Sequence, residues 1–232
     1  MIIIHCMQYL IQAVIFDLDG VIVDSNPAIE EFWKNLANKH GIPLTQPQIR
    51  QWIHGRKIGD TLSGLFRHLS DSQLEEIRES AYLFDQNMHP GPISGIESFV
   101  QSLQALQIPT GIVTSSHQSR MQEMIRQLGL LQQFSHFVTA HDVSKGKPDP
   151  EPYLAMGTKM NIAPEHCLVF EDAISGIQSA TGAGMHTIGI GNEDASTDLT
   201  LHGAKDVIEH YAAIRIHQRT FTTPNGTVFS LA

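Results

Sequence analysis

The chain has 232 residues, with 15 Lys and Arg against 24 Asp and Glu, so its formal net charge is -9. This balance, without a basic cluster, excludes a nucleic-acid footprint, and no apolar run approaches the roughly 18 residues of a membrane span. The two cysteines, Cys6 and Cys167, lie far apart without a CxxC pair, which fits a reducing compartment. We expect a cytoplasmic protein that is a monomer.

The first predicted element is a strand over residues 13–16. The apolar segment before it, MIIIHCMQYLI, lacks a basic start and an A-x-A cleavage site. We therefore interpret it as an extension that leads into the strand and not as a signal peptide. The strand itself is apolar throughout, which is typical of a strand buried on both faces of a parallel sheet.

Two acidic residues follow this strand directly. Asp17 and Asp19 stand at its end, and Gly20 turns the chain. Crowded carboxylates repel each other, so the pattern indicates a cation between them. An exposed loop with two solvated acids is the alternative, because an isolated DxD is common.

The next segment, residues 27–89, is predicted to contain only helices. Asn26 and Pro27 are typical of a helix start, and apolar residues follow at helical spacing as far as Gly41. Further helices are expected at residues 48–53, 58–69 and 71–86. Pro90-Gly91-Pro92 then interrupts the chain. We predict a core of residues 1–26 and 90–232 with an all-helical cap of residues 27–89 inserted into it.

Helices and strands alternate after this interruption. Helices are expected at residues 95–106, 118–128, 151–160 and 174–181. Strands are expected at residues 110–114, 136–139, 167–170 and 186–190. The alternation is typical of an α/β fold with a Rossmann-like, doubly wound parallel sheet. A hairpin is expected around Asn225-Gly226 near the C-terminus.

Polar residues follow several of these strands. Ligands of open α/β sheets bind beyond the carboxyl ends of the strands, where the chain has Asp17, Asp19, Thr114, Ser115, Lys145, Lys147, Glu171 and Asp172. Each residue has an ordinary alternative, because acids and hydroxyls cap helices and a lysine can be solvated. Their convergence at equivalent strand ends favours a catalytic site.

These residue types suit phosphoryl transfer. Mg²⁺ prefers hard oxygen ligands, and the acidic candidates for its site are Asp17, Asp19, Glu171 and Asp172. The candidates for binding phosphate are Thr114, Ser115 and Lys147. Asp17 could attack phosphorus to give an aspartyl-phosphate. Asp19 would protonate the leaving alkoxide and then deprotonate the attacking water.

Four motifs of the chain together resemble those of the haloacid dehalogenase-like hydrolases with a helical cap. They are DLDGVIVDS, VTSS, KGKPDPEPY and VFEDAISGIQSATGAGM. The resemblance runs from about residue 13 to residue 190. It implies a nucleophilic Asp17, an acid/base Asp19, phosphate binding by Thr114 and Lys147, Mg²⁺ binding by Asp172, and a mobile cap. The second aspartate argues against true dehalogenases, and the lack of membrane spans excludes the ion-pumping relatives.

Two branches of that family compete. β-Phosphoglucomutases look similar, but their cap histidine and arginine, which hold a sugar bisphosphate, correspond to Ile29 and Ile58. The stretches NPAIEEFWKNL, IHGRKIGDTL and TAHDVSKGKPDPEPY resemble glycerol-phosphate and 2-deoxyglucose-6-phosphate phosphatases. This comparison favours a phosphatase acting on a small phosphorylated metabolite, a sugar or polyol phosphate, with a mutase as the alternative.

The predicted substrate-facing part of the cap is the stretch His54, Gly55, Arg56 and Lys57. It is the one place in the cap where a basic pair adjoins a glycine. An ordinary turn between two helices is the alternative reading. A binding module that keeps only the fold is a further hypothesis, but the retained aspartates, lysine and terminal acid pair argue against it.

Overall fold

The computed structural model describes residues 9–232. Residues 1–8 of the predicted N-terminal extension therefore lie outside the described residues. The helices are α1 (Asn26–Lys39), α2 (Gln46–Trp52), α3 (Ile58–Leu65), α4 (Asp71–Asn87), α5 (Ile96–Ala105), α6 (Gln118–Gln127), α7 (Glu151–Met160), α8 (Ile174–Gly182) and α9 (Glu193–Leu201). None of these helices combines the length and apolar character that crossing a membrane requires.

The strands form two sheets. They are β1 (Tyr9–Ile11), β2 (Ala13–Phe16), β3 (Thr110–Val113), β4 (His136–Val138), β5 (Cys167–Glu171), β6 (His186–Ile190), β7 (Asp206–Ile208), β8 (Arg215–His217), β9 (Thr220–Thr222) and β10 (Val228–Leu231). The larger sheet has the order β4-β3-β2-β5-β6-β7, and all its pairings are parallel. The predicted α/β fold with a doubly wound parallel sheet is confirmed.

The strand β2 lies in the middle of this sheet and is buried on both faces. Val14 and Phe16 pack with α5 and α6 in one hydrophobic cluster. Ala13 and Ile15 pack in a second cluster with residues of α7 and α8. The chain moves from β2 to β3 and β4 on one side, and β5, β6 and β7 lie on the other. This change of direction opens a crevice beyond the carboxyl end of β2, where ligands bind in such folds.

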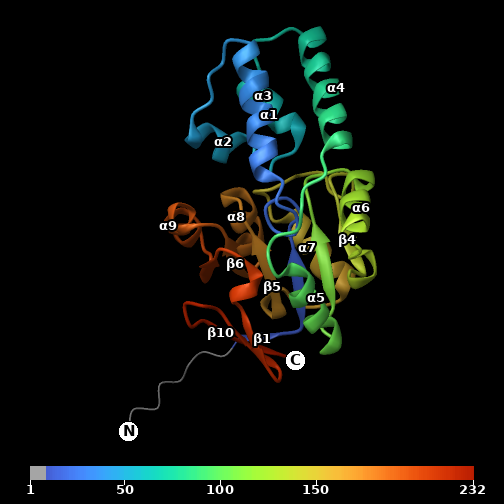
Figure 1. Cartoon of the computed structure of the whole chain (residues 1–232), viewed down its shortest axis with the longest axis vertical. Helices are drawn as coiled ribbons and strands as arrows, with labels where there is room; N and C mark the ends of the chain where they lie inside the picture. Colours follow the sequence, from blue (N-terminus) through green and yellow to red (C-terminus); the bar gives the residue numbers. More distant parts are fainter. Residues whose placement is uncertain (1–8) are drawn as a thin grey trace.

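The smaller sheet has the order β1-β10-β9-β8 and covers the opposite end of the core (Figure 1). The predicted hairpin is formed by β9 and β10, which pair antiparallel. Phe221 and Phe229 stack within it, with ring centroids 4.8 Å apart. The strand β1 pairs with β10, so the two ends of the described chain are joined far from the crevice.

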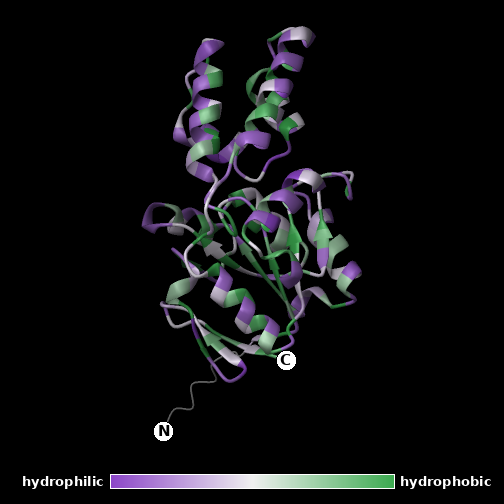
Figure 2. Ribbon diagram, turned by 45° about the vertical axis from the view of Figure 1, so that its right-hand side comes forward, coloured by the Kyte–Doolittle hydropathy of each residue, from purple (hydrophilic) through white to green (hydrophobic). Residues whose placement is uncertain are grey.

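The helices α1–α4, which we call the helical unit, lie above the carboxyl ends of the sheet strands (Figure 1). They enclose their own hydrophobic cluster, whose fully or largely buried members include Trp33, Ile49, Leu62, Phe66 and Ile77. Figure 2 shows apolar strands at the centre of the core, whereas the helical unit carries both polar and apolar residues.

Two helices of this unit differ from the predicted bounds. The helix α2 begins at Gln46 and not at residue 48, because Thr45 forms a capping box with Gln48. The helix α3 ends at Leu65 and not at residue 69, because Phe66 leaves the helical conformation with φ -114° and ψ 15°.

Candidate active site

The carboxyl ends of β2 and β3 and the helical unit border a cavity of about 520 Å³. The core contributes Asp17, Asp19, Thr114, Ser115, Ser116, His117 and Arg120 to its walls. The helical unit contributes residues from α1, the 53–58 segment and α4. The predicted residues after β2 and β3 therefore meet at this cavity, whereas Lys147, Glu171 and Asp172 lie beside Asp17 without lining it.

Lys147 is buried at the centre of this site, with 1% of its side chain exposed. Its ammonium group donates to Asp17 Oδ1 at 2.6 Å, to Glu171 Oε1 at 2.5 Å and to the Val113 carbonyl at 3.1 Å. The nearby carboxylates raise its pKa despite burial, so it stays charged. Lys147 thus neutralises part of the charge of two buried acids.

Glu171 holds this lysine in place and is itself firmly held. Its Oε1 also accepts from the Tyr153 hydroxyl at 2.8 Å. Its Oε2 accepts from the backbone N–H groups of Asp172 and Ala173. Gly176 lies directly against the carboxylate, where an added Cβ would stand 1.9 Å from the Glu171 carboxyl carbon. The first turn of α8 can cover Glu171 this closely only with glycine at that position.

Three carboxylates lie close enough together to share a metal ion. One oxygen each of Asp17, Glu171 and Asp172 lies within 4.8 Å of the others. Burial raises the pKa of Asp17 to about 7 although Lys147 opposes the shift, and burial followed by the charge of Glu171 raises the pKa of Asp172 well above its usual value. One lysine therefore leaves this acidic group short of positive charge, and the hard oxygen donors fit Mg²⁺.

The loop after β2 approaches this acidic group closely. Gly20 has φ +71°, and an added Cβ would stand 2.2 Å from Asp172 Oδ2 and 2.3 Å from Asn26 Nδ2. Asn26, the first residue of α1, donates to the same Asp172 oxygen at 2.5 Å. Both the backbone conformation and the space therefore require glycine after the DxD pair.

Asp19 lies apart from the three-carboxylate group and faces Arg120 in the first turn of α6. The guanidinium donates to both carboxylate oxygens of Asp19 at 2.7 Å, a bidentate pair. Burial alone would raise the pKa of Asp19, but the charge and hydrogen bonds of Arg120 outweigh it, and the pKa lies below its usual value. In this arrangement Asp19 is a carboxylate.

Arg120 also joins the core to the helical unit. Its Nε lies 3.1 Å from Asp85 Oδ1 near the end of α4, and only 9% of the Arg120 side chain is exposed. Ser25 donates to the Asp19 carboxylate as well, at 2.5 Å. The side chain of Asp19 is therefore held by Ser25 and by Arg120, which in turn pairs with Asp85 of α4.

The two hydroxyl residues after β3 have different surroundings. Thr114 is buried, and its hydroxyl oxygen accepts from the Ser116 N–H at 3.1 Å. Ser115 donates its hydroxyl to the Gly55 carbonyl in the helical unit at 2.8 Å. Both residues line the cavity, and their predicted roles as phosphate ligands stay predictions.

The segment His54, Gly55, Arg56 and Lys57, which we call the 54–57 loop, joins α2 to α3 at the bottom of the helical unit. His54, Gly55 and Arg56 line the cavity. His54 Nε2 lies 3.3 Å from Glu30 Oε1. Arg56 lies over the Trp52 ring, at 5.5 Å from its centroid. Lys57 is not among the lining residues, and its ammonium bonds the core backbone instead.

One part of the wall that the helical unit gives to the cavity is apolar. Ile29 and Ile58 both line it, together with Phe32, Trp33 and Phe84. The rings of Phe32 and Phe84 stack, with centroids 4.4 Å apart, so α1 and α4 meet across this wall. Polar side chains stand further along α4, namely Glu75, Arg78, Glu79 and Asp85.

Sequence reasoning missed three residues that hold the acids in place: Asn26, Arg120 and Tyr153. Asn26 was assigned only as a helix cap, although it also bonds Asp172. Arg120 could have been suspected as the basic residue in the helix that follows Thr114. Tyr153 carries no signal of its own, because only the fold brings α7 beside Glu171.

Comparison with known proteins agrees with this geometry. A family profile described as haloacid dehalogenase-like hydrolase matches residues 14–190. Validoxylamine A 7'-phosphate phosphatase of Streptomyces hygroscopicus subsp. limoneus is 33% identical, with 76% of this chain and 84% of that protein covered. Hexitol phosphatase A of Escherichia coli is 32% identical, with 83% and 91% covered. A crystal structure of β-phosphoglucomutase from Clostridium difficile superposes with a TM-score of 0.71 at 25% identity, with 86% and 91% covered.

Proposed function

Because the chain belongs to the haloacid dehalogenase-like hydrolases and is a phosphoric monoester hydrolase of that family, we propose that it releases phosphate from small sugar or polyol phosphates with Mg²⁺. The observation that carries this proposal is the buried pair of Asp17, which lines the cavity, and Lys147, with two further acids beside Asp17. The phosphorylated compounds named for Validoxylamine A 7'-phosphate phosphatase and Hexitol phosphatase A support the substrate class.

Asp17 is proposed as the nucleophile. Its carboxylate stands at the end of β2, at the cavity floor, and Lys147 keeps counter-charge within 2.6 Å of it. Mg²⁺, when bound, would supply the charge that offsets the repulsion between the phosphate dianion and this carboxylate. We propose Asp17 and Asp172 as its side-chain ligands, with Glu171, whose two oxygens already accept hydrogen bonds, orienting Lys147.

Asp19 is proposed as the acid/base group. Its carboxylate form, held by Arg120, suits deprotonation of the water that cleaves the aspartyl-phosphate. To protonate the leaving alkoxide, the same carboxyl group must first take up a proton, which requires it to leave Arg120. The hydroxyl of Thr114 and the ammonium of Lys147 are proposed as the phosphate ligands.

The apolar part of the helical unit's wall supports a hydrolase over a mutase. A mutase must hold a hexose bisphosphate while the sugar reorients, and this needs polar groups from the helical unit. Ile29 and Ile58, which by resemblance stand in place of the cap histidine and arginine of the mutases, line the cavity and offer no side-chain hydrogen bond. We therefore propose that water is the acceptor and that the helical unit acts as a cap over the site.

The test is a panel of sugar and polyol phosphates together with β-glucose 1-phosphate. We expect release of inorganic phosphate from at least one member of the panel, and no formation of glucose 6-phosphate from β-glucose 1-phosphate. The release should stop on addition of a chelator and return with excess Mg²⁺. Isomerisation faster than hydrolysis would show that the protein is a mutase and not a phosphatase. Phosphate release that persists in the chelator would contradict the proposed dependence on Mg²⁺.

A further inference from the structure

The 54–57 loop is bonded to several core segments that also carry site residues. Ser115 donates to the Gly55 carbonyl at 2.8 Å, and Ser175 donates to the His54 carbonyl at 3.3 Å. Arg56 and Lys57 donate in the other direction, from the helical unit to core carbonyls. The loop therefore rests on the end of β3, the start of α8 and the chain between β4 and α7.

Lys57 donates to two carbonyls of the core. Its ammonium group donates to the carbonyls of Ala140 and Val143 at 3.0 and 3.1 Å. The aliphatic part of its side chain lies against Gly146, where an added Cβ would stand 3.0 Å from Lys57 Cε. The lysine thus lies along the segment of residues 140–147, which we call the 140–147 loop.

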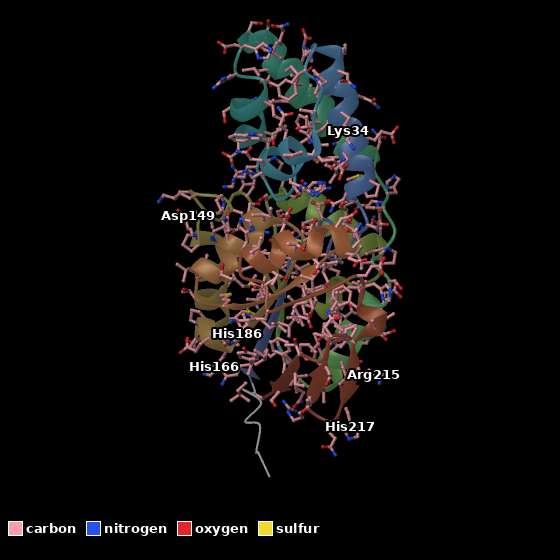
Figure 3. All side chains as sticks on the ribbon, turned by 90° about the vertical axis from the view of Figure 1, so that its left-hand side faces the viewer. Lys34, Asp149, His166, His186, Arg215 and His217 are labelled. Atoms are coloured by element: carbon pink, nitrogen blue, oxygen red, sulfur yellow. The ribbon has the colours of Figure 1, made fainter. Side chains whose placement is uncertain are left out.

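The 140–147 loop ends at the lysine that binds Asp17. Arg56 Nη1 donates to the carbonyl of Lys147 at 2.9 Å, so the backbone of this residue is held from the helical unit. Its side chain is held from the core by Asp17, Glu171 and Val113. Figure 3 labels Asp149, two residues further on, at the part of the core that faces the helical unit.

We infer that Lys57, assisted by Arg56, is a positioning residue that couples the seated position of the helical unit to the placement of Lys147. A charged donor that bonds two carbonyls restrains the 140–147 loop more strongly than neutral hydrogen bonds do. Without these donors the loop would lose this restraint from the helical unit. The inference rests on the proposed function for the role of Lys147, but its structural part requires no substrate.

The test combines hydrogen exchange with steady-state kinetics on the full chain. Lys57→Met keeps the aliphatic contact with Gly146 and removes the ammonium group. We expect faster amide exchange within residues 140–147 and a kcat for phosphate release lower by about tenfold, with KM little changed. Lys57→Arg should restore both properties, because its guanidinium also donates to carbonyls.

The matched control is Lys34→Met in the same helical unit. Lys34, labelled on α1 in Figure 3, pairs only with Glu30 one turn away among the described residues, at 2.8 Å, and its loss should change neither property. A raised KM with unchanged exchange at residues 140–147 would make Lys57 a substrate ligand and overturn the inference. Unchanged exchange and kcat would overturn it too. Failure of the wild-type protein to release phosphate would count against the proposed function alone, because the exchange result is read without substrate.

Discussion

Asp17→Asn should abolish phosphate release while the protein stays folded. The amide is not a nucleophile and is a poor ligand for Mg²⁺, so both the proposed attack and the metal site are lost. The fold should not suffer, because burial disfavours the charged form of Asp17 and raises its pKa to about 7. A group whose folded pKa is raised costs stability when it is charged, so the neutral amide removes that cost. Phosphate release measured with Mg²⁺ tests the first expectation, and thermal unfolding measured without Mg²⁺ tests the second.

Asp24→Asn is the control for this substitution. Asp24 is an exposed acid of the same chain segment and lies outside the proposed nucleophile and metal ligands. It should keep phosphate release near the wild-type rate. If Asp17→Asn retained comparable activity in folded protein, Asp17 would not be the nucleophile. If Asp17→Asn unfolded at a clearly lower temperature than the wild type, the charged form of Asp17 would stabilise the fold, which would contradict the cost assigned here to its burial.

Lys147→Met should impair both stability and catalysis. The substitution leaves Asp17 and Glu171 buried without their shared cation, and removal of one partner from a buried ion pair costs about 3–5 kcal/mol. Loss of a charged donor at the reacting phosphate should lower kcat by about 10²–10³-fold. Urea unfolding gives the first quantity. Phosphate release from samples that are folded by circular dichroism gives the second.

Lys145→Met is the matched control two residues away. Lys145 is 70% exposed and pairs with Asp149 at 3.3 Å. An exposed pair of this kind contributes about 0–1 kcal/mol, so the variant should unfold near the wild-type urea concentration and keep its activity. Equal losses in the two variants, or the reverse order, would show that Lys147 is not the lysine on which the site depends.

The residues at the strand ends could be predicted because parallel strands place their carboxyl ends at one edge. Asp17, Thr114 and Asp172 each follow an apolar strand, so the pattern of the sequence predicts that they meet. The alternation of helices and strands predicted the sheet for the same reason. These inferences use only local patterns and one general rule of α/β folds.

The partners of these residues could not be predicted, because they depend on how helices are rotated against the sheet. Arg120 lies 101 positions from Asp19 in the chain, and only the docking of α6 brings them together. The direction of Lys57 likewise depends on how the helical unit rests on the core. A basic residue beside a glycine indicated a functional loop, but it did not reveal that the ammonium bonds Ala140 and Val143.

The small C-terminal elements were predicted only in part. The hairpin of β9 and β10 was predicted from Asn225-Gly226. The helix α9 was missed, because its sequence EDASTDLTL is mostly polar and Leu199 is the one buried residue that the helix contributes. The strands β7 and β8 were missed because each has three residues and begins with a charged residue, Asp206 in β7 and Arg215 in β8.

The central claim is that the phosphoryl group of the substrate is transferred to Asp17 before water releases it as phosphate. The most direct measurement is acid quenching during turnover, followed by digestion and mass spectrometry of the peptide that contains residues 13–25. The account predicts the added mass of one phosphoryl group on this peptide, located at Asp17 and absent from Asp17→Asn. A phosphoryl group at another residue would contradict this claim. So would the absence of any phosphoryl group under conditions in which hydrolysis of the intermediate is the slowest step.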